Sequence, residues 1–329
     1  MFSNNNIEEA IEIFGLSANS DIKRVTNGVN SNVFVISDQS KKYILKFYRK
    51  DNNSPTRLER EVSALELFHA NGIKNVPELL SHSKRLNCSL LSFIPGENIF
   101  QFSQDYIVHF QSFFKKILSL SNGLDKGVLN LNAIDCCMEI NTINSQIESR
   151  LTNLRKENNI QIDTLLNQIE EIFQFVARQI KMLNNNFNNL KPILSTVDFG
   201  INNAIIKNKE FHFIDFEFFG WDNPIHLISD TISHPANNLN IHEQSALLDA
   251  ILECYTIPEE LEEILKAFNG VNLLFDIKWC LIMLNPFLSS YNSNSEQAEL
   301  QTRQLIQKMK VIDKLDLIKL KTQNAKFFY

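Results

Sequence analysis

The sequence predicts an α+β fold with two lobes, a small β-rich N-terminal lobe and a larger, mainly helical C-terminal lobe. The first hundred residues have a β-rich pattern with one helix, including strand-like Leu79-Leu80, and apolar residues recur mainly at helical spacing after that. One short predicted β-hairpin interrupts the helical part. Because 329 residues exceed what one small core needs, we expect two domains, residues 1–95 and 96–329.

The first predicted hairpin joins Val33–Ile36 to Lys42–Tyr48 through a polar turn at residues 38–40. Successive side chains of a strand point to opposite faces of the sheet. Residues 43, 45 and 47 should therefore share one face, and residues 44, 46 and 48 the other. This alternation leaves Lys46 in the middle of a strand among apolar residues.

A helix should follow, with Ser54 as its N-cap and Pro55 at its first helical position. Four apolar residues recur at helical spacing, namely Leu58, Val62, Leu65 and Phe68. Asn71-Gly72 should end the helix with a left-handed residue. The strand-like segment Leu90–Ile94 then leads to Pro95-Gly96, a sharp turn near which we place the lobe boundary.

The C-terminal lobe should be helical from about residue 102 to 190, most clearly at Gln146–Asn158 and Ile162–Leu183. A short hairpin should follow, with strands Ala204–Lys207 and Phe211–Phe216 around an Asn208-Lys209 turn. The chain from residue 226 onward again has a helical pattern. A β-rich lobe followed by a helical lobe with one internal hairpin is a specific order of elements.

Charge and composition exclude several function classes. The net charge is −6 without a strongly basic block, so we do not expect nucleic acid as a partner, because neutralising its phosphates needs clustered Lys and Arg. The five cysteines are odd in number and lack metal-ligand spacing, which is typical of reduced thiols in the cytoplasm. The N-terminus lacks the basic region of a signal peptide. The apolar stretch Val271–Leu288, broken by Asp276 and Lys278, predicts a buried helix and no membrane span.

Three residues around the second hairpin carry the main chemical signal. Asp198 and Asn203 lie in the segment that leads into the hairpin, and Asp215 ends its return strand. Since a hairpin brings its end back to its start, two carboxylates and an amide oxygen should converge. Such hard oxygen ligands suit magnesium carrying a nucleoside triphosphate, and a carboxylate that the metal does not need can accept the proton of an attacking hydroxyl. Alone, an Asp and an Asn five residues apart are as typical of capping or turn roles.

Lys46 provides a second candidate. A lysine among apolar residues is costly unless it is paired, although it can also reach solvent from an edge strand. Either Glu61 or the neighbouring Glu59 on the following helix could pair with it, and the apolar pattern does not decide between them. A strand lysine held by a helix glutamate is how kinases set a cation against the α- and β-phosphates of a nucleotide.

The turn before the first strand, residues 27–32, is a third candidate. Backbone amides around Gly28, Ser31 and Asn32 could approach a phosphate group. The turn has a single glycine, so the same letters are equally consistent with an ordinary hairpin turn.

Together these pieces resemble the aminoglycoside phosphotransferase and choline kinase superfamily, over about residues 24–230. That family has a strand lysine, a helix glutamate, a loop His-Gly-Asp-x-x-x-x-Asn and a metal-binding Asp after the next strand, and the run 195–230 is similar to a bacterial branch of it. The resemblance implies a two-lobed protein-kinase-like fold with ATP (or GTP) and Mg²⁺ as cofactors. It implies Asp198 as catalytic base, Asn203 and Asp215 on magnesium, Lys46 on the phosphates with Glu61 as its partner, and Ser92 to Ile94 as the hinge that holds the adenine.

The chain departs from the family pattern in several places. The loop His and Gly are replaced by Thr196 and Val197, which affects the geometry of the loop more than its chemistry. The phosphate loop is poor in glycine, and Leu227 replaces the Asp of a Pro-x-x-Asp-Leu-Ala segment. Residues 198–200 spell the Asp-Phe-Gly metal motif of protein kinases. However, residues 178–194 contain no Asp or Glu that could be the catalytic Asp upstream of it, so we assign these letters to the catalytic loop.

The sequence therefore predicts an ATP-dependent kinase that phosphorylates a hydroxyl of a small polar metabolite, such as a sugar, an amino alcohol or an aminoglycoside-like compound. A non-catalytic nucleotide-binding pseudokinase or interaction module is the alternative, which the change at Thr196-Val197 keeps open. A protein kinase is disfavoured because no Ala-Pro-Glu-like end of an activation segment follows Asp215. Neither a nucleic acid nor a membrane is expected as a partner.

Some polar residues of the helical part allow more than one interpretation. His226, Asp230 and His234 could bind a metal, but scattered polar residues more often cap helices or form hydrogen bonds in a core. Asp276 and Lys278 interrupt an apolar helix and should either face solvent or line a cleft. The late segment, residues 296–321, predicts a solvated amphipathic helix.

Overall fold

The computed structural model describes residues 4–25, 31–50, 55–125, 127, 129–182, 186–196, 198–291 and 297–323. The chain forms two compact units. The first unit comprises Met1–Ile134, Leu194–Val197 and Ile201–Trp221, and the second comprises Asp135–Ile193, Asp198–Gly200 and Asp222–Tyr329. These units are defined by compactness, so the lobe boundary expected between residues 95 and 96 stays a prediction.

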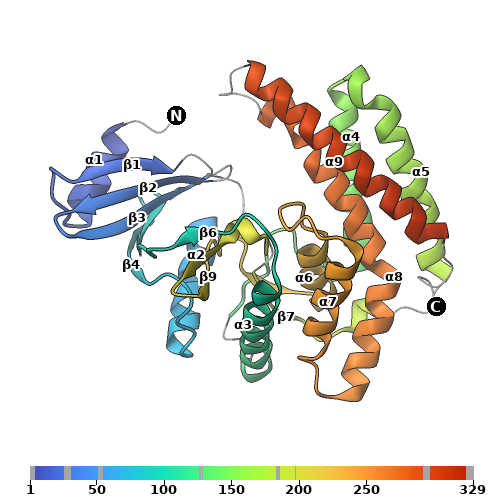
Figure 1. Ribbon diagram of the computed structural model, residues 1–329, viewed down its shortest axis with the longest axis horizontal. Helices are drawn as coiled ribbons and strands as arrows, with labels where there is room; N and C mark the ends of the chain where they lie inside the picture. Colours follow the sequence, from blue (N-terminus) through green and yellow to red (C-terminus); the bar gives the residue numbers. More distant parts are fainter. Residues whose placement is uncertain are drawn as a thin grey trace. The chain divides into compact units, whose positions relative to one another are not determined.

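A five-stranded antiparallel sheet forms the N-terminal part of the first unit, with the strand order β1-β2-β3-β5-β4 (Figure 1). The strands are β1 (Asp21–Val25), β2 (Ser31–Asp38), β3 (Lys41–Tyr48), β4 (Leu79–Ser83) and β5 (Cys88–Ser92). The predicted first hairpin is confirmed, with Gln39 at φ 54° in its turn. β5 ends at Ser92, two residues before the end expected from the sequence.

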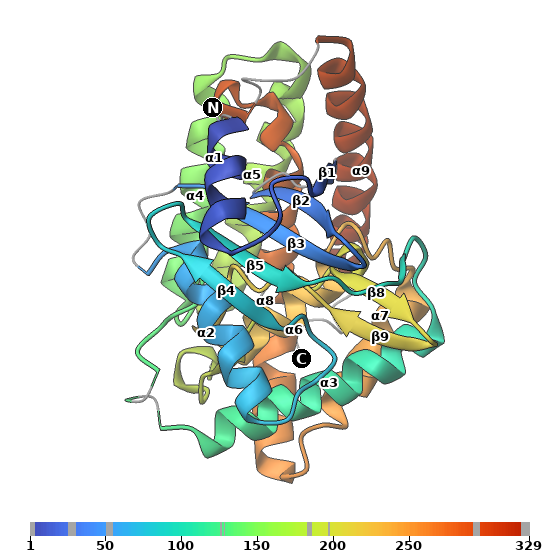
Figure 2. The same ribbon diagram turned by 90° about the vertical axis from the view of Figure 1, so that its left-hand side faces the viewer.

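The two faces of β3 differ in what they contact: Leu45 and Phe47 are on one face, and Lys46 is on the other. Leu45 and Phe47 lie in a core with α1 (Asn4–Ile13), as Figure 2 shows for the helix and the sheet. Lys46 lies on the other face, and its Nζ is 4.9 Å from the centre of the Tyr48 ring. The predicted alternation along this strand is therefore confirmed, and it directs one buried lysine away from the apolar core.

Helix α2 (Arg57–Ala70) begins after the N-cap Thr56. The Thr56 side chain accepts a hydrogen bond from the Glu59 amide, and the Glu59 side chain accepts one from the Thr56 amide. The predicted N-cap Ser54 lies outside the described residues, and the prediction that Pro55 is the first helical residue is wrong. A Thr with a Glu three residues later satisfies two free amides reciprocally, so this capping box fixes the start. The predicted end is confirmed, with Gly72 at φ 73°.

The rest of the first unit contains a long helix and short strands. These are β6 (Glu97–Asn98), α3 (Gln104–Gly123), β7 (Ile193–Ser195), β8 (Ala204–Lys207), β9 (Glu210–Phe213) and β10 (Gly220–Asp222). Left-handed residues Asn208 and Lys209 close the predicted β8–β9 hairpin. β9 ends at Phe213, however, so Asp215 lies beyond the strand and not within it as predicted. The left-handed φ of 70° at Asp215 turns the chain out of the extended conformation.

The second unit is helical. Its helices are α4 (Ile140–Lys156), α5 (Ile160–Met182), α6 (Pro224–Ser233), α7 (Ile241–Leu252), α8 (Pro258–Met283) and α9 (Gln297–Gln323). Helices α4, α5, α6 and α9 pack against α8 (Figure 1). Over the described residues, one helical stretch, Pro258–Phe287, is long and apolar enough to cross a membrane. Because 83% of its most apolar window is buried, it has the character of a core helix.

Asp276 and Lys278 of α8 are buried, so the expectation that they face solvent or line a cleft is wrong. Asp276 is 3% exposed and forms ion pairs with two lysines of α9, Lys314 at 2.7 Å and Lys321 at 3.0 Å. It also accepts a hydrogen bond from the Ser233 hydroxyl. Burial alone would raise the pKa of Asp276, but the two lysines hold this pKa well below its usual value. Because Lys314 and Lys321 lie far from Asp276 along the chain, no local sequence pattern predicted these ion pairs.

Candidate active site

A buried lysine with three acidic neighbours occupies the first unit. Lys46 Nζ lies 2.6 Å from Glu61 Oε2, 2.5 Å from Asp215 Oδ1 and 3.4 Å from Glu217 Oε2. Burial alone would lower the pKa of Lys46, but the carboxylates of these residues raise it well above 10.5. The side chain of Lys46 therefore carries a positive charge, which the three surrounding carboxylates stabilise.

Glu61 connects this lysine to the segment that follows Asp215. Its Oε2 accepts a hydrogen bond from Lys46, and its Oε1 accepts one of 3.2 Å from the Phe216 amide. The alternative partner Glu59 is used elsewhere, in the capping box of α2 and in an exposed ion pair with Lys84. The structure thus decides the choice that the apolar pattern left open, in favour of Glu61.

Glu217 is a member of the cluster that the sequence did not single out. It is 1% exposed, and its Oε1 accepts a 2.6 Å hydrogen bond from Arg57, whose guanidinium lies over the Phe218 ring. Burial and the nearby Asp215 carboxylate raise the pKa of Glu217 to about 7, against the opposing influence of Lys46 and Arg57. A separation of 160 residues between Arg57 and Glu217 left no local signal for this pair.

The candidate metal ligands Asn203 and Asp215 both lie in the first unit. Asn203 ends a short 3-10 turn, Ile201–Asn203, and its backbone carbonyl accepts a 2.9 Å hydrogen bond from the Ile214 amide. That bond fixes the residue next to Asp215 against Asn203. A carboxylate and an amide oxygen are hard donors, so they fit Mg²⁺, which commonly binds through one or two carboxylates together with phosphate oxygens of a substrate.

The candidate nucleotide residues of the sheet take several positions. Gly28 lies outside the described residues. Ser31 and Asn32 begin β2, where they pair with Tyr48 and Phe47, and Asn32 also accepts a 2.7 Å hydrogen bond from Arg24. Ser31 is buried.

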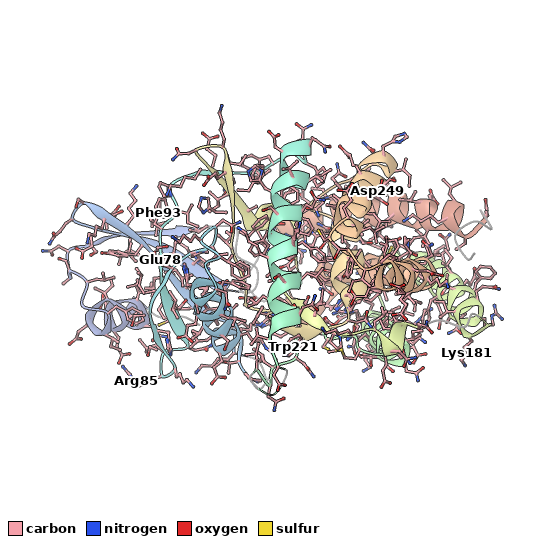
Figure 3. All side chains as sticks on the ribbon, turned by 90° about the horizontal axis from the view of Figure 1, so that it is seen from below. Glu78, Arg85, Phe93, Lys181, Trp221 and Asp249 are labelled. Carbon is pink, nitrogen blue, oxygen red and sulfur yellow. The ribbon has the colours of Figure 1, made fainter. Side chains whose placement is uncertain are left out.

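The expected hinge begins at the end of β5. The Ser92 hydroxyl accepts a hydrogen bond from the Glu78 amide, and both Ser92 and Ile94 are half-buried. Between them Phe93, labelled in Figure 3, has Lys42 Nζ 5.6 Å from its ring centre. The hinge segment is thus anchored at its first residue by β4 and β5.

Asp198 belongs to the second unit, where the end of α6 holds it. The His234 Nε2 lies 2.7 Å from Asp198 Oδ1, and the Asp198 amide donates to Asp230 Oδ2 at 3.1 Å. From the sequence, His234 and Asp230 could be metal ligands, helix caps or core residues, and no pattern predicted their contacts with Asp198. The signal was weak, since 36 residues separate the His from the Asp. In the described part of the chain, no group of three or more His, Cys, Asp or Glu residues could hold a metal ion.

A second polar cluster is buried in the helical unit. Asp222 Oδ2 lies 2.5 Å from His226 Nδ1, and its Oδ1 accepts hydrogen bonds from the amides of Cys137 and Asn223. Lys278 Nζ faces this cluster, 3.4 Å from His226 Nε2. Burial would lower the pKa of His226, but the Asp222 carboxylate outweighs it and raises this pKa to about 10. The side chains of Asp222, His226 and Lys278 are all buried, which indicates a structural role for the cluster.

Solved structures with the same fold include a spectinomycin phosphotransferase in complex with ADP and spectinomycin. That structure has a TM-score of 0.65 and 15% sequence identity, covering 97% of this chain and 99% of the other. A choline kinase from Cryptosporidium parvum has a TM-score of 0.60 and 14% identity, covering 94% of this chain and 97% of the other. An ethanolamine kinase from Plasmodium vivax has a TM-score of 0.59 and 13% identity, covering 98% and 86%.

At these identities the likeness shows the fold, a two-lobed kinase-like α+β fold with an antiparallel N-terminal sheet and a mostly helical remainder. A search of curated protein sequences gave no match. A sequence profile described as the phosphotransferase enzyme family matches residues 21–264, from β1 into α8. Since this match spans well over half of the chain, the protein belongs to the phosphotransferase enzyme family.

Proposed function

We propose that this phosphotransferase moves the γ-phosphate of ATP, or of GTP, to a hydroxyl group of a small polar metabolite. One observation carries the proposal. The strand lysine Lys46, the helix residue Glu61 and the post-hairpin residue Asp215 meet at one point within the first unit, although 169 residues separate Lys46 from Asp215. A cation held in this way is suited to the phosphates of a nucleotide.

Each residue has a distinct role in the proposed reaction. Lys46 binds phosphate oxygens, and Glu61 holds its ammonium group in place. Asn203 and Asp215 hold Mg²⁺, which would neutralise charge on the phosphates. Asp198 orients the hydroxyl of the acceptor and takes its proton as the oxygen attacks the γ-phosphorus, after which the nucleoside diphosphate leaves.

Gly28, Ser31 and Asn32 are proposed to approach the phosphates, and Ser92 and Ile94 to contact the nucleotide base. The buried Ser31 on β2 and the anchored Ser92 on β5 pair with opposite ends of β3, the strand between them. A rigid sheet is a good support for a nucleotide because its backbone groups are already fixed by pairing.

The acceptor is proposed to be a sugar, an amino alcohol or an aminoglycoside-like compound. The similar structures are a spectinomycin phosphotransferase bound to spectinomycin, an ethanolamine kinase and a choline kinase. Spectinomycin, ethanolamine and choline carry a basic or quaternary nitrogen as well as a hydroxyl, and the net charge of −6 of this chain suits a cation. The five free cysteines support a cytoplasmic location, where thiols stay reduced and ATP is available as a substrate.

The test is ADP release from ATP and Mg²⁺ with spectinomycin, choline, ethanolamine and an uncharged sugar as acceptors. We expect acceptor-dependent turnover, and we expect Asp198→Asn to lower kcat by about 10²–10⁴-fold, the range of a general base. Asp249→Asn is the matched control, since Asp249 is exposed on α7 (Figure 3). Turnover that survives Asp198→Asn at full rate would reject Asp198 as the base, and failure to bind ATP would reject the nucleotide site.

A further inference from the structure

The His234 side chain makes an unexpected contact with the proposed base. His234 is the C-cap residue of α6, is 7% exposed, and has its Nε2 2.7 Å from Asp198 Oδ1. Its other ring nitrogen, Nδ1, accepts a 3.2 Å hydrogen bond from the Ala236 amide. A nitrogen that accepts carries no proton, so the ring is neutral and its proton is on Nε2. His234 therefore donates a hydrogen bond to the Asp198 carboxylate.

The surroundings of His234 hold its ring in this orientation. The Trp279 ring of α8 packs edge-on against it, with ring centres 4.7 Å apart at 71°. Two further contacts fasten the same short segment to the end of α6. The Asp198 amide donates to Asp230, and the Asn237 side chain donates to the carbonyls of Phe199 and Thr231. Thus residues 198–200 are held by the α6 end at three separate points.

The segment before Asp198 contains a buried hydroxyl without a partner among the described residues. Thr196, two residues before Asp198, is 2% exposed, and its hydroxyl has no hydrogen-bond partner among the described residues. Asp198 also has a left-handed backbone, with φ 68°. A residue held in such a conformation needs surrounding contacts to persist. His234, Asp230 and Asn237, from α6 and the segment after it, supply such contacts.

We propose that His234 is a positioning residue for the phosphoryl transfer, an inference that rests on the proposed role of Asp198 as base. Its Nε2–H fixes one carboxylate oxygen and thereby sets the direction in which the carboxylate faces the acceptor hydroxyl. A ring that donates from Nε2 while Nδ1 accepts carries no positive charge, so it orients the carboxylate without the loss of basicity that a nearby cation would cause. A misplacement of about 1 Å can cost 10²-fold in rate, so loss of this one bond should appear in kcat.

The test compares His234→Leu with His234→Gln in the full chain. Leu fills the site without a donor, whereas the Gln side-chain amide can present an N–H near the position of Nε2. With MgATP and the acceptors named above, we expect His234→Leu to lower kcat by about 10- to 100-fold and His234→Gln to restore most of it. The KM for ATP and the Kd for ADP should change by less than about 2-fold, since the proposed phosphate contacts belong to other residues. His242→Leu, an exposed histidine of α7, is the control.

The outcomes separate this inference from the proposed function. Turnover that Asp198→Asn leaves intact overturns the proposed function. Turnover that depends on Asp198 but is unaffected by His234→Leu, or lowered equally by Leu and Gln, overturns the inference alone. If His234→Leu does not fold, an NMR measurement that needs no enzymatic turnover tests the inference instead. The imidazole ¹⁵N spectrum of the intact protein, with the signal assigned through His234→Gln, should show an Nε2–H tautomer that responds to Asp198→Asn, and an Nδ1–H tautomer contradicts it.

Discussion

Two aspartates with proposed chemical roles share an uncommon backbone conformation. Asp198 has φ 68° and Asp215 has φ 70°, both in the left-handed region that side chains with a Cβ seldom adopt. Such a conformation costs about 1–2 kcal/mol per residue. At Asp215 the surrounding bonds offset this cost, since Lys46 binds its carboxylate and Glu61 binds the next amide. The direction of each carboxylate is therefore set by the backbone as well as by its partners.

Replacing Asp215 by Ala and by Gly isolates this backbone strain, since both variants remove the carboxylate from Lys46. Only Ala keeps a Cβ, so we expect Asp215→Ala to be less stable than Asp215→Gly by about 1 kcal/mol in urea unfolding. The same pair at Asp21, an exposed residue of β1, should give the reverse order, because glycine weakens a strand. An identical order at both sites would show that the φ of Asp215 carries no strain.

At the scale of single residues, proximity along the chain decided what the sequence could predict. The Lys46–Glu61 pair was predictable because a strand followed directly by a helix brings the two residues together. The contacts of Glu217 with Arg57 and of Asp198 with His234 join residues that are 160 and 36 positions apart in the chain. Both contacts depend on how helices and loops pack against one another, so no local sequence pattern predicted them.

At the scale of elements, α2 connects several parts of the site in the first unit. Arg57 and Glu61 reach Glu217, Lys46 and the Phe216 amide, and Arg60 donates to the carbonyls of Asn132 and Phe219. The capping box at Thr56 fixes the first turn of this helix. The start of α2 thus sets the position from which Arg57 approaches its partner.

We expect Thr56→Ala to lower the free energy of unfolding by about 1 kcal/mol, because it removes the side-chain oxygen that accepts from the Glu59 amide. Thr56→Ser keeps that oxygen and should be close to the wild type. Chemical denaturation of all variants checks this. Thr152→Ala in the exposed middle of α4 is the comparison, and it should change stability by less than about 0.5 kcal/mol. Equal losses at the two threonines would rule out a capping contribution.

The predicted elements were recovered better than their ends. The β8–β9 turn and the end of α2 were found because left-handed residues such as Gly72 and Asn208 leave a clear sequence signal. The start of α2 was misplaced because Ser54-Pro55 is also a good capping signal, and the reciprocal bonds of Thr56 with Glu59 prevailed. Ends that depend on a competition between two local signals are decided by small energy differences.

At the scale of the whole molecule, stability should depend on pH through His226. The pKa of His226 in the folded protein is about 10, above the value of 6.5 of a free histidine, because Asp222 stabilises the charged ring. The folded state therefore binds this proton more tightly than the unfolded state does. The resulting stabilisation is fully present below pH 6.5 and is lost progressively as the pH rises toward 10.

Urea unfolding of the wild type between pH 6.5 and 9 should thus show a falling free energy of unfolding, by at most about 1.4 kcal/mol per pH unit from this group. His226→Gln cannot gain or lose a proton at this position, so its stability should fall less steeply over the same range. His242→Gln, at an exposed histidine, should keep the slope of the wild type. A slope unchanged by His226→Gln would contradict the assignment.

The buried Asp276 has a consequence for how the protein is made. Its carboxylate is neutralised by Lys314 and Lys321, which a ribosome adds 38 and 45 residues later. Until those lysines have emerged, burial of Asp276 would leave an unpaired charge in an apolar helix, which is strongly unfavourable. We therefore expect helix α8 to reach its final place only after α9 has been synthesised, so that the helical unit completes its folding late in translation.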